Sequence, residues 1–146
     1  IGVQNQTYFN VAKDAGPNLD LQMIALKILY DLNKRFYFVG EASFAYEGES
    51  GGYAHGIFGL GIRSNRFIKN KFSTYIELLA GVAGGAGVDK GEGILVRPNI
   101  GINYYVNDNF NFTVAAGRTA TPFGNVNSTN INLGFTYSLS ILNAKK

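Results

Sequence analysis

Residues 94–106 read ILVRPNIGINYYV, and the fold can be predicted from the pattern of these residues. Every even position from Ile94 to Val106 carries an apolar side chain. The odd positions between them include Arg97, two asparagines and a glycine. Successive side chains of a β-strand point to opposite faces, so this period of two predicts a strand with one apolar and one polar face.

The same period recurs along the chain, with Gly, Pro, Asn, Asp and Ser in the links between the repeats. The expected strands are 2–12, 19–30, 36–46, 53–62, 72–82, 94–106, 110–117 and 130–140. Residues 19–30 also contain good helix formers, so a helix remains an alternative there. Short links permit only antiparallel neighbours. The sequence therefore predicts an all-β, eight-stranded antiparallel up-and-down barrel, as a single domain over 1–146.

Composition excludes several kinds of site. The 146 residues contain no cysteine and a single histidine, His55. This rules out disulfides, zinc–thiolate sites, cysteine nucleophiles and paired-histidine metal motifs. No run of 18 apolar residues is present, so no transmembrane helix is available. We expect neither a metal nor a cofactor.

The low charge content predicts which face points inward. Charged residues make up 16% of the chain, whereas solvated surfaces carry about a quarter to a third. The only charged residues on the polar strand faces are Lys27, Glu41, Glu77 and Arg97, and the single histidine, His55, lies on the same faces. This face suits the interior of a small barrel, and the uncharged apolar face suits hydrocarbon. The fold class is thus a transmembrane β-barrel.

The four interior charges are two acids and two bases. Hairpin registers across links 31–35 and 84–93 place Lys27 diagonal to Glu41 and Glu77 diagonal to Arg97. We expect these two pairs to form a structural polar network, because buried charges need partners. Two alternatives remain: Glu41 and Glu77 could form an acid–base carboxylate couple, or the network could gate a narrow conduction path.

Aromatic residues gather toward both ends of the apolar face, as two interfacial girdles would. One end carries Tyr30, Phe36, Phe38, Phe72 and Phe110, and the opposite end carries Phe9, Phe44 and Tyr46.

With these features the chain resembles the small eight-stranded outer-membrane barrels of Gram-negative bacteria, of the OmpA and OmpX type. Residues 130–139 (NINLGFTYSL) carry the most specific likeness, since Gly134, Tyr137 and Leu139 resemble the carboxy-terminal signal read by the barrel assembly machinery. Family members usually end on an aromatic residue, whereas ILNAKK (141–146) follows here. Pro98 also departs from the pattern, and we expect a β-bulge there.

The resemblance implies an outer-membrane location with both termini in the periplasm. Links 31–35, 64–70 and 107–109 would be periplasmic turns, and the remaining four would be external loops. The turn side is basic, with Lys34, Arg35, Arg63, Arg66, Lys69 and Lys71. The loop side is acidic, with Asp14, Glu47, Glu49, Asp89 and Glu92. Expected partners are membrane lipid, lipopolysaccharide and, during insertion, the assembly machinery. We expect a monomer and no nucleic acid, because no basic face with interleaved aromatics is present.

The function these features favour is a structural or interaction role without catalysis, because eight strands leave no wide aqueous channel. A second hypothesis is an acyl hydrolase acting on lipid A, with His55 as its base. We expect His55 to be a hydrogen-bonded residue of the lumen or its rim instead. A third hypothesis is a narrow channel, and a fourth is a soluble barrel with reversed faces that carries a hydrophobic ligand.

Overall fold

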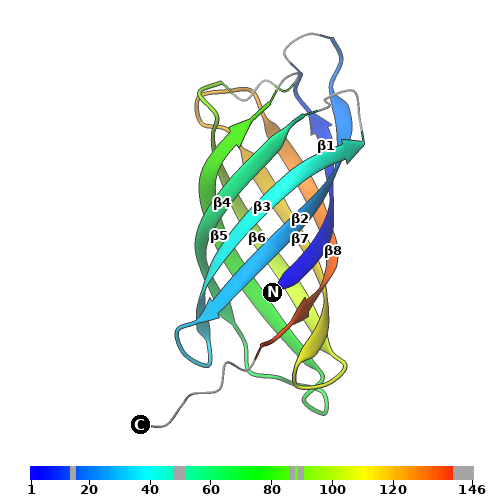
Figure 1. Ribbon diagram of the computed structural model, residues 1–146, viewed down its shortest axis with the longest axis vertical. Coiled ribbons are helices and arrows are strands. Elements are labelled where there is room, and N and C mark those ends of the chain that lie inside the picture. Colours follow the sequence, from blue (N-terminus) through cyan, green and yellow to red (C-terminus); the bar gives the residue numbers. More distant parts are fainter. Residues whose placement is uncertain (14–15, 48–51, 86–87, 89–90, 140–146) are drawn as a thin grey trace.

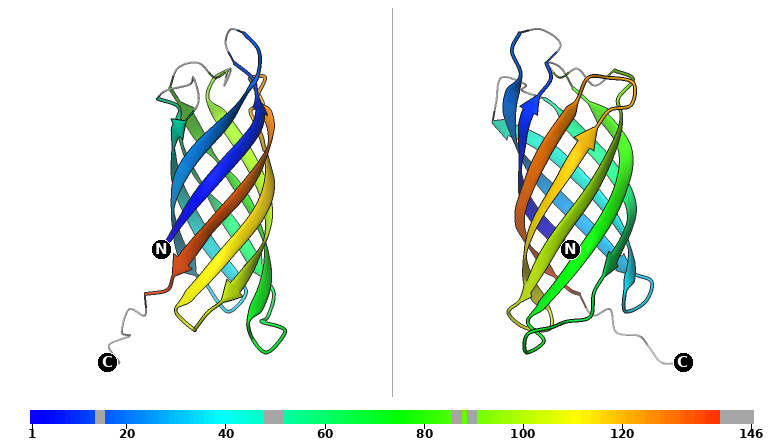
Figure 2. Two further views of the ribbon diagram at one scale, coloured as in Figure 1. Left: turned by 90° about the vertical axis from the view of Figure 1, so that its right-hand side faces the viewer. Right: turned by 180° about the vertical axis from the view of Figure 1, so that it is seen from behind.

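The computed structural model describes residues 1–13, 16–47, 52–85, 88 and 91–139. Its eight strands are β1 (Gly2–Val11), β2 (Leu19–Asp31), β3 (Phe36–Glu47), β4 (Ala54–Arg63), β5 (Phe72–Gly84), β6 (Ile94–Tyr105), β7 (Phe110–Ala120) and β8 (Asn127–Tyr137). Each strand pairs antiparallel with its neighbours along the chain, and β1 pairs with β8 to close the barrel (Figures 1 and 2). This confirms the expected fold class. Within the described ranges, no helix has the length and apolar character needed to cross a membrane.

Most strands begin and end within two residues of the expected positions. Residues 19–31 form a strand, so the helical interpretation of this segment is wrong. The β7–β8 hairpin differs most, because β7 runs on to Ala120 and β8 starts at Asn127. Arg118 pairs with Thr129 in the ladder between them. The polar composition of this stretch therefore suggested a longer loop than the backbone pairing leaves.

The expected bulge at Pro98 is wrong. Pro98 pairs with Leu78 of β5 in an unbroken register. On the β7 side the ladder lacks partners at positions 97 and 98, and the register of Val96 with Ala120 is the same as that of Asn99 with Gly117. Pro98 has no backbone N–H to donate, so strand pairing with β7 is interrupted locally at positions 97 and 98, without the extra residue that a bulge would insert.

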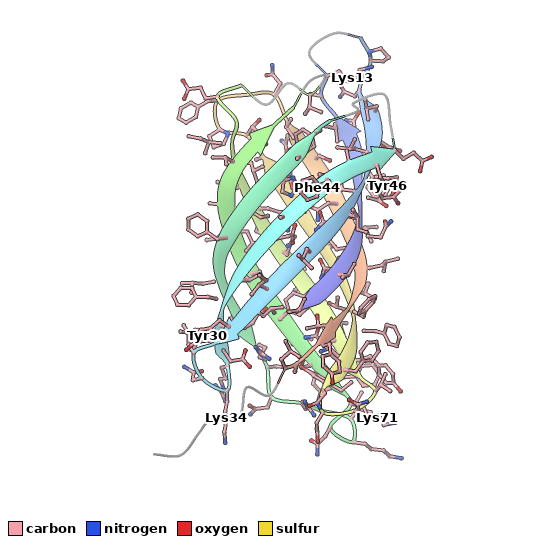
Figure 3. The ribbon with its side chains drawn as sticks, viewed as in Figure 1. Lys13, Tyr30, Lys34, Phe44, Tyr46 and Lys71 are labelled. Carbon is pink, nitrogen blue, oxygen red and sulfur yellow. The ribbon has the colours of Figure 1, made fainter. Side chains whose placement is uncertain are left out.

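The apolar side chains point outward, as the sequence predicts. Phe38, Ile100 and Phe135 are 50%, 59% and 43% exposed, respectively. Figure 3 shows side chains projecting from the barrel wall along its length, with Tyr30 toward one end and Phe44 and Tyr46 toward the opposite end. We call the first the turn end, where connections 32–35, 64–71 and 106–109 lie, and the second the loop end. Apolar groups therefore cover the outside of the barrel between its two ends.

The interior contains two clusters of apolar residues beside its polar groups. One cluster fills the loop end of the lumen and comprises Tyr8, Val11, Leu21, Met23, Tyr53, Val88 and Val126. A second cluster comprises Tyr37, Val39, Ile57, Leu79 and Leu95. These residues share the inward face with the polar groups, because a small barrel must fill its lumen with side chains.

Two tyrosine rings inside the barrel each lie over a glycine of the neighbouring strand. Tyr37 of β3 pairs with Gly61 of β4, and Tyr75 of β5 pairs with Gly101 of β6. A Cβ added at Gly101 would lie 2.5 Å from the Tyr75 ring. The inward glycines therefore make the room that these large side chains need.

Candidate functional site: the charged lumen

The four charged residues singled out in the sequence come from four different strands. Lys27 lies on β2, Glu41 on β3, Glu77 on β5 and Arg97 on β6. All four point into the lumen and are at most 5% exposed. The inward side of the alternating pattern therefore brings them together in the middle of the barrel.

The ion pairs cross the lumen rather than joining neighbouring strands. Arg97 Nη2 lies 2.6 Å from Glu41 Oε2, and Lys27 Nζ lies 2.8 Å from Glu77 Oε2. The expected pairing of Lys27 with Glu41 and of Glu77 with Arg97 is therefore wrong.

Strand register alone did not reveal these partners. Lys27 and Glu41 are directly opposite in the β2–β3 ladder, and Glu77 faces Asn99 beside Arg97. Side chains of this length can span a narrow lumen. Each charged group can therefore pair with a group on the opposite wall as well as with one on the neighbouring strand.

Three polar residues that the sequence did not single out complete the network around Arg97 and Glu41. Gln6 Nε2 and Ser43 Oγ each donate to Glu41 Oε1 at 2.8 Å. Arg97 Nη1 donates to the Tyr8 hydroxyl at 2.5 Å. In the sequence, only their positions on the inward-facing side of β1 and β3 could have identified them. The pair thus has several hydrogen-bond partners, as a buried ion pair requires.

Around Lys27 and Glu77, the second ion pair has fewer partners. Lys27 Nζ donates to both carboxylate oxygens, at 2.9 and 2.8 Å. The Tyr37 hydroxyl donates to Glu77 Oε1 at 3.1 Å.

His55 lies inside the lumen and is 4% exposed, deeper than a rim position. Its ring sits edge-on to Tyr8 and Tyr53 at centroid distances of 6.0 and 5.9 Å. His55 Nε2 is 3.6 Å from Glu41 Oε1, the same oxygen that accepts a hydrogen bond from the Ser43 hydroxyl. Within the described residues neither ring nitrogen of His55 has a hydrogen-bond partner, so the expectation of a hydrogen-bonded histidine is wrong.

This cluster does not have the geometry of a nucleophilic triad. A serine nucleophile donates its proton to the histidine, which the acid orients from the opposite side. Here the Ser43 hydroxyl donates its hydrogen bond to the Glu41 carboxylate and not to His55. All three residues are buried.

Below the ion pairs, toward the turn end, the lumen holds a cavity of about 700 Å³. Lys27, Glu77 and Gln4 line its inner end, and turn residues such as Lys34 line its outer end. Arg63 pairs with Asp31 at this outer end, over the Tyr37 ring.

A second arginine occupies the same level. Arg66 Nη1 lies 2.8 Å from Asp108 Oδ1, and its guanidinium lies 3.8 Å from the centre of the Tyr105 ring. Along its axis the lumen therefore runs from an apolar cluster at the loop end, through the ion pairs, to a polar cavity at the turn end. Among the described side chains, no three potential metal ligands gather.

Several residues singled out in the sequence lie outside the described residues. These are Asp14, Glu49 and Asp89 of the loop side and the final segment 141–146.

No family model matches the sequence, and no curated protein matches it significantly. The fold is nevertheless similar to several solved structures. Neisserial surface protein A superposes with a TM-score of 0.61 at 14% identity, over 94% of this chain and 96% of that one. Ail, the attachment invasion locus protein of Yersinia pestis, solved with the heparin analogue sucrose octasulfate, gives 0.58 at 17% identity, over 93% and 95%.

A protein from the de novo design of transmembrane β-barrels gives a TM-score of 0.63 at 10% identity, over 94% of this chain and 93% of that one. At these identities the likeness concerns the fold. The chain has the fold of the small eight-stranded outer-membrane β-barrels.

Proposed function

We propose that the protein is an integral outer-membrane barrel with a structural or interaction role, and that it neither catalyses a reaction nor passes bulk solute. One observation carries this proposal. The outside of the barrel is apolar around its circumference, whereas the inside is filled by paired charges and apolar side chains.

The outer surface supports insertion into a bilayer. A closed barrel satisfies its backbone hydrogen bonds internally, which hydrocarbon demands. Soluble monomers rarely expose apolar patches larger than a few hundred Å². Here large apolar side chains point outward on all eight strands.

The polar lining of the interior cavity argues against a soluble carrier of a hydrophobic ligand. Such a carrier needs an apolar cavity, whereas Lys27, Glu77 and Gln4 line the inner end of the cavity found here. The outward exposure of Phe38, Ile100 and Phe135 also contradicts the reversed faces that a soluble carrier requires.

The test is the behaviour of the purified protein with and without detergent. We expect it to require detergent, and to migrate faster on a gel unheated than after boiling, because the closed barrel resists unfolding by the gel detergent. A monodisperse sample in plain buffer would contradict the proposal.

A narrow channel is the second candidate, because the turn-side cavity reaches the Lys27–Glu77 pair from one end. The ion pairs and the apolar cluster lie between that cavity and the loop end. Planar-bilayer recordings are therefore expected to give no discrete conductance. Discrete steps that change in Glu77→Gln would favour the channel instead.

A lipid A hydrolase is the enzymatic candidate, and the proximity of Ser43, His55 and Glu41 makes it worth testing. We expect no deacylation of lipopolysaccharide, because the side chains of His55 and Glu41 are fully buried. Deacylation that His55→Ala abolishes would overturn our proposal.

We further infer a monomer that contacts lipopolysaccharide and phospholipid in the membrane. The continuous β1–β8 ladder supports this, because a closed barrel has no free strand edge to pair with a second copy. Light scattering in detergent, corrected for bound detergent, tests the mass.

Insertion by the assembly machinery is inferred from the likeness of Gly134, Tyr137 and Leu139 to its signal. If that inference holds, Tyr137→Ala should slow insertion in cells but not in detergent refolding.

A further inference from the structure

The turn end of the barrel is strongly basic. Its connections and adjoining strand ends carry six basic side chains, Lys34, Arg35, Arg63, Arg66, Lys69 and Lys71, and two acidic ones, Asp31 and Asp108. Asp31 forms an ion pair with Arg63, and Asp108 forms one with Arg66. In the part of the chain that the structure describes, the remaining four make no ion pair, and all four are exposed. We call these four, Lys34, Arg35, Lys69 and Lys71, the basic rim.

Apolar side chains stand among the basic ones. Leu32, Phe67, Ile68 and Val106 are all exposed on the turns, and Ile68 is the most exposed of them at 66%. Ile68 also has a φ of 46°, a left-handed conformation that β-branched residues rarely adopt. Of the three connections at the turn end, 64–71 lies furthest from the middle of the barrel (Figure 2). The 32–35 and 64–71 connections thus present basic and apolar groups side by side.

The basic rim lies at the height of lipid headgroups in an inserted barrel. Figure 3 shows Lys34 and Lys71 at the turn end, farther from the middle of the barrel than Tyr30. The headgroup layer is roughly 5–8 Å thick on each side of a bilayer. A strand rises about 3.3 Å per residue and is tilted by about 45° in a membrane, so each residue advances roughly 2.3 Å along the membrane normal. Residues two or three beyond the last outward aromatic therefore fall within that layer. Basic groups there meet phosphates, and neighbouring apolar groups meet the upper part of the acyl chains.

A groove of about 490 Å³ opens at the same end of the barrel. Ile62, Ile76 and Ile100, which point outward from β4, β5 and β6, form its apolar wall. Arg35 and the turn residue Asn65 also line it. The groove therefore combines a surface for an acyl chain with a guanidinium and an amide for a phosphate.

We propose that the basic rim binds anionic phospholipid, and that the groove holds one such molecule with its phosphate against Arg35. This inference rests on the proposed insertion into a membrane. A guanidinium binds phosphate through directed hydrogen bonds, and uncompensated positive charge favours a net anionic headgroup over a zwitterionic one. Each basic side chain near the surface contributes about fivefold in affinity for anionic lipid.

The test compares lipid selectivity in the native protein and in a fourfold variant. The protein is reconstituted into vesicles of equal parts phosphatidylcholine and phosphatidylglycerol, and the lipid it retains is measured by native mass spectrometry and with spin-labelled lipids. We expect phosphatidylglycerol to be preferred at least about fivefold. Lys34→Gln, Arg35→Gln, Lys69→Gln and Lys71→Gln in combination should abolish the preference, and high salt should weaken it.

The matched control is Arg118→Gln, which removes a basic side chain near the loop end of β7. It should leave the preference unchanged. Two single variants address the groove. Arg35→Gln should lose the most tightly retained lipid, and Ile76→Trp, which fills the groove but keeps every charge, should lose the same molecule.

Three outcomes would overturn the inference. Equal retention of the two lipids by the native protein is one, and an undiminished preference in the fourfold variant is another. Equal competition by lipid A is the third, because the rim would then recognise any phosphate rather than a glycerophospholipid. In each case gel mobility reports whether the barrel is folded in the bilayer. A folded, inserted barrel that shows no preference for anionic lipid would contradict this inference but not the proposed function. A barrel that stays folded and soluble without a bilayer would contradict both.

Discussion

At the scale of the residue, Arg97 depends most on its partners. Its side chain is fully buried, and Glu41 supplies the compensating charge. Glu41→Gln keeps the shape but leaves the guanidinium without a counter-charge, so we expect the free energy of unfolding to fall by about 3–5 kcal/mol. Urea titration of the barrel in lipid vesicles, followed by the gel-mobility difference, measures this loss.

Two further variants separate burial from charge. Asp108→Asn removes the partner of Arg66 at the turn end, where the Asp108 side chain is 93% exposed, and should cost less than about 1 kcal/mol. Replacing the pair together, as Glu41→Leu with Arg97→Met, should recover most of the stability. If Glu41→Gln costs no more than Asp108→Asn, the network does not stabilise the barrel.

At the scale of the element, the β5–β6 pair is shaped by the Tyr75 ring over Gly101. Because an added Cβ would lie 2.5 Å from that ring, Gly101→Ala should lower the free energy of unfolding by about 1–3 kcal/mol through overpacking. Gly56→Ala on β4 is the control, since no atom lies within 4 Å of its added Cβ. Equal effects of the two changes in the same titration would mean that the ring moves aside freely.

At the scale of the whole molecule, the apolar outer surface should respond to charge by depth. Leu78 lies midway along β5 and Thr74 lies near its turn end, and both point outward. Leu78→Arg should cost about 2–4 kcal/mol in a bilayer, and Thr74→Arg about 0–1 kcal/mol. The unfolding titration in vesicles measures both. Similar small costs at both positions would indicate that water, rather than hydrocarbon, surrounds the middle of the barrel.

The alternating pattern of the sequence determined the strands, their antiparallel order and the direction of each face. These properties are local, because neighbouring residues in a strand alternate wherever the strand lies. The scarcity of charge on the polar face then separated inside from outside. Residues such as Phe38 and Ile100 could therefore be assigned to the outer surface without coordinates.

The pairing of the interior groups, in contrast, follows only from the closed barrel. Lys27 and Glu41 are ladder partners, yet each binds a charge on the opposite wall. The burial of His55 beneath Tyr8 and the cavity at the turn end also required the closed barrel. The physical reason is that contacts across the lumen depend on the barrel's diameter and stagger, which closure of β1 against β8 sets over the whole chain.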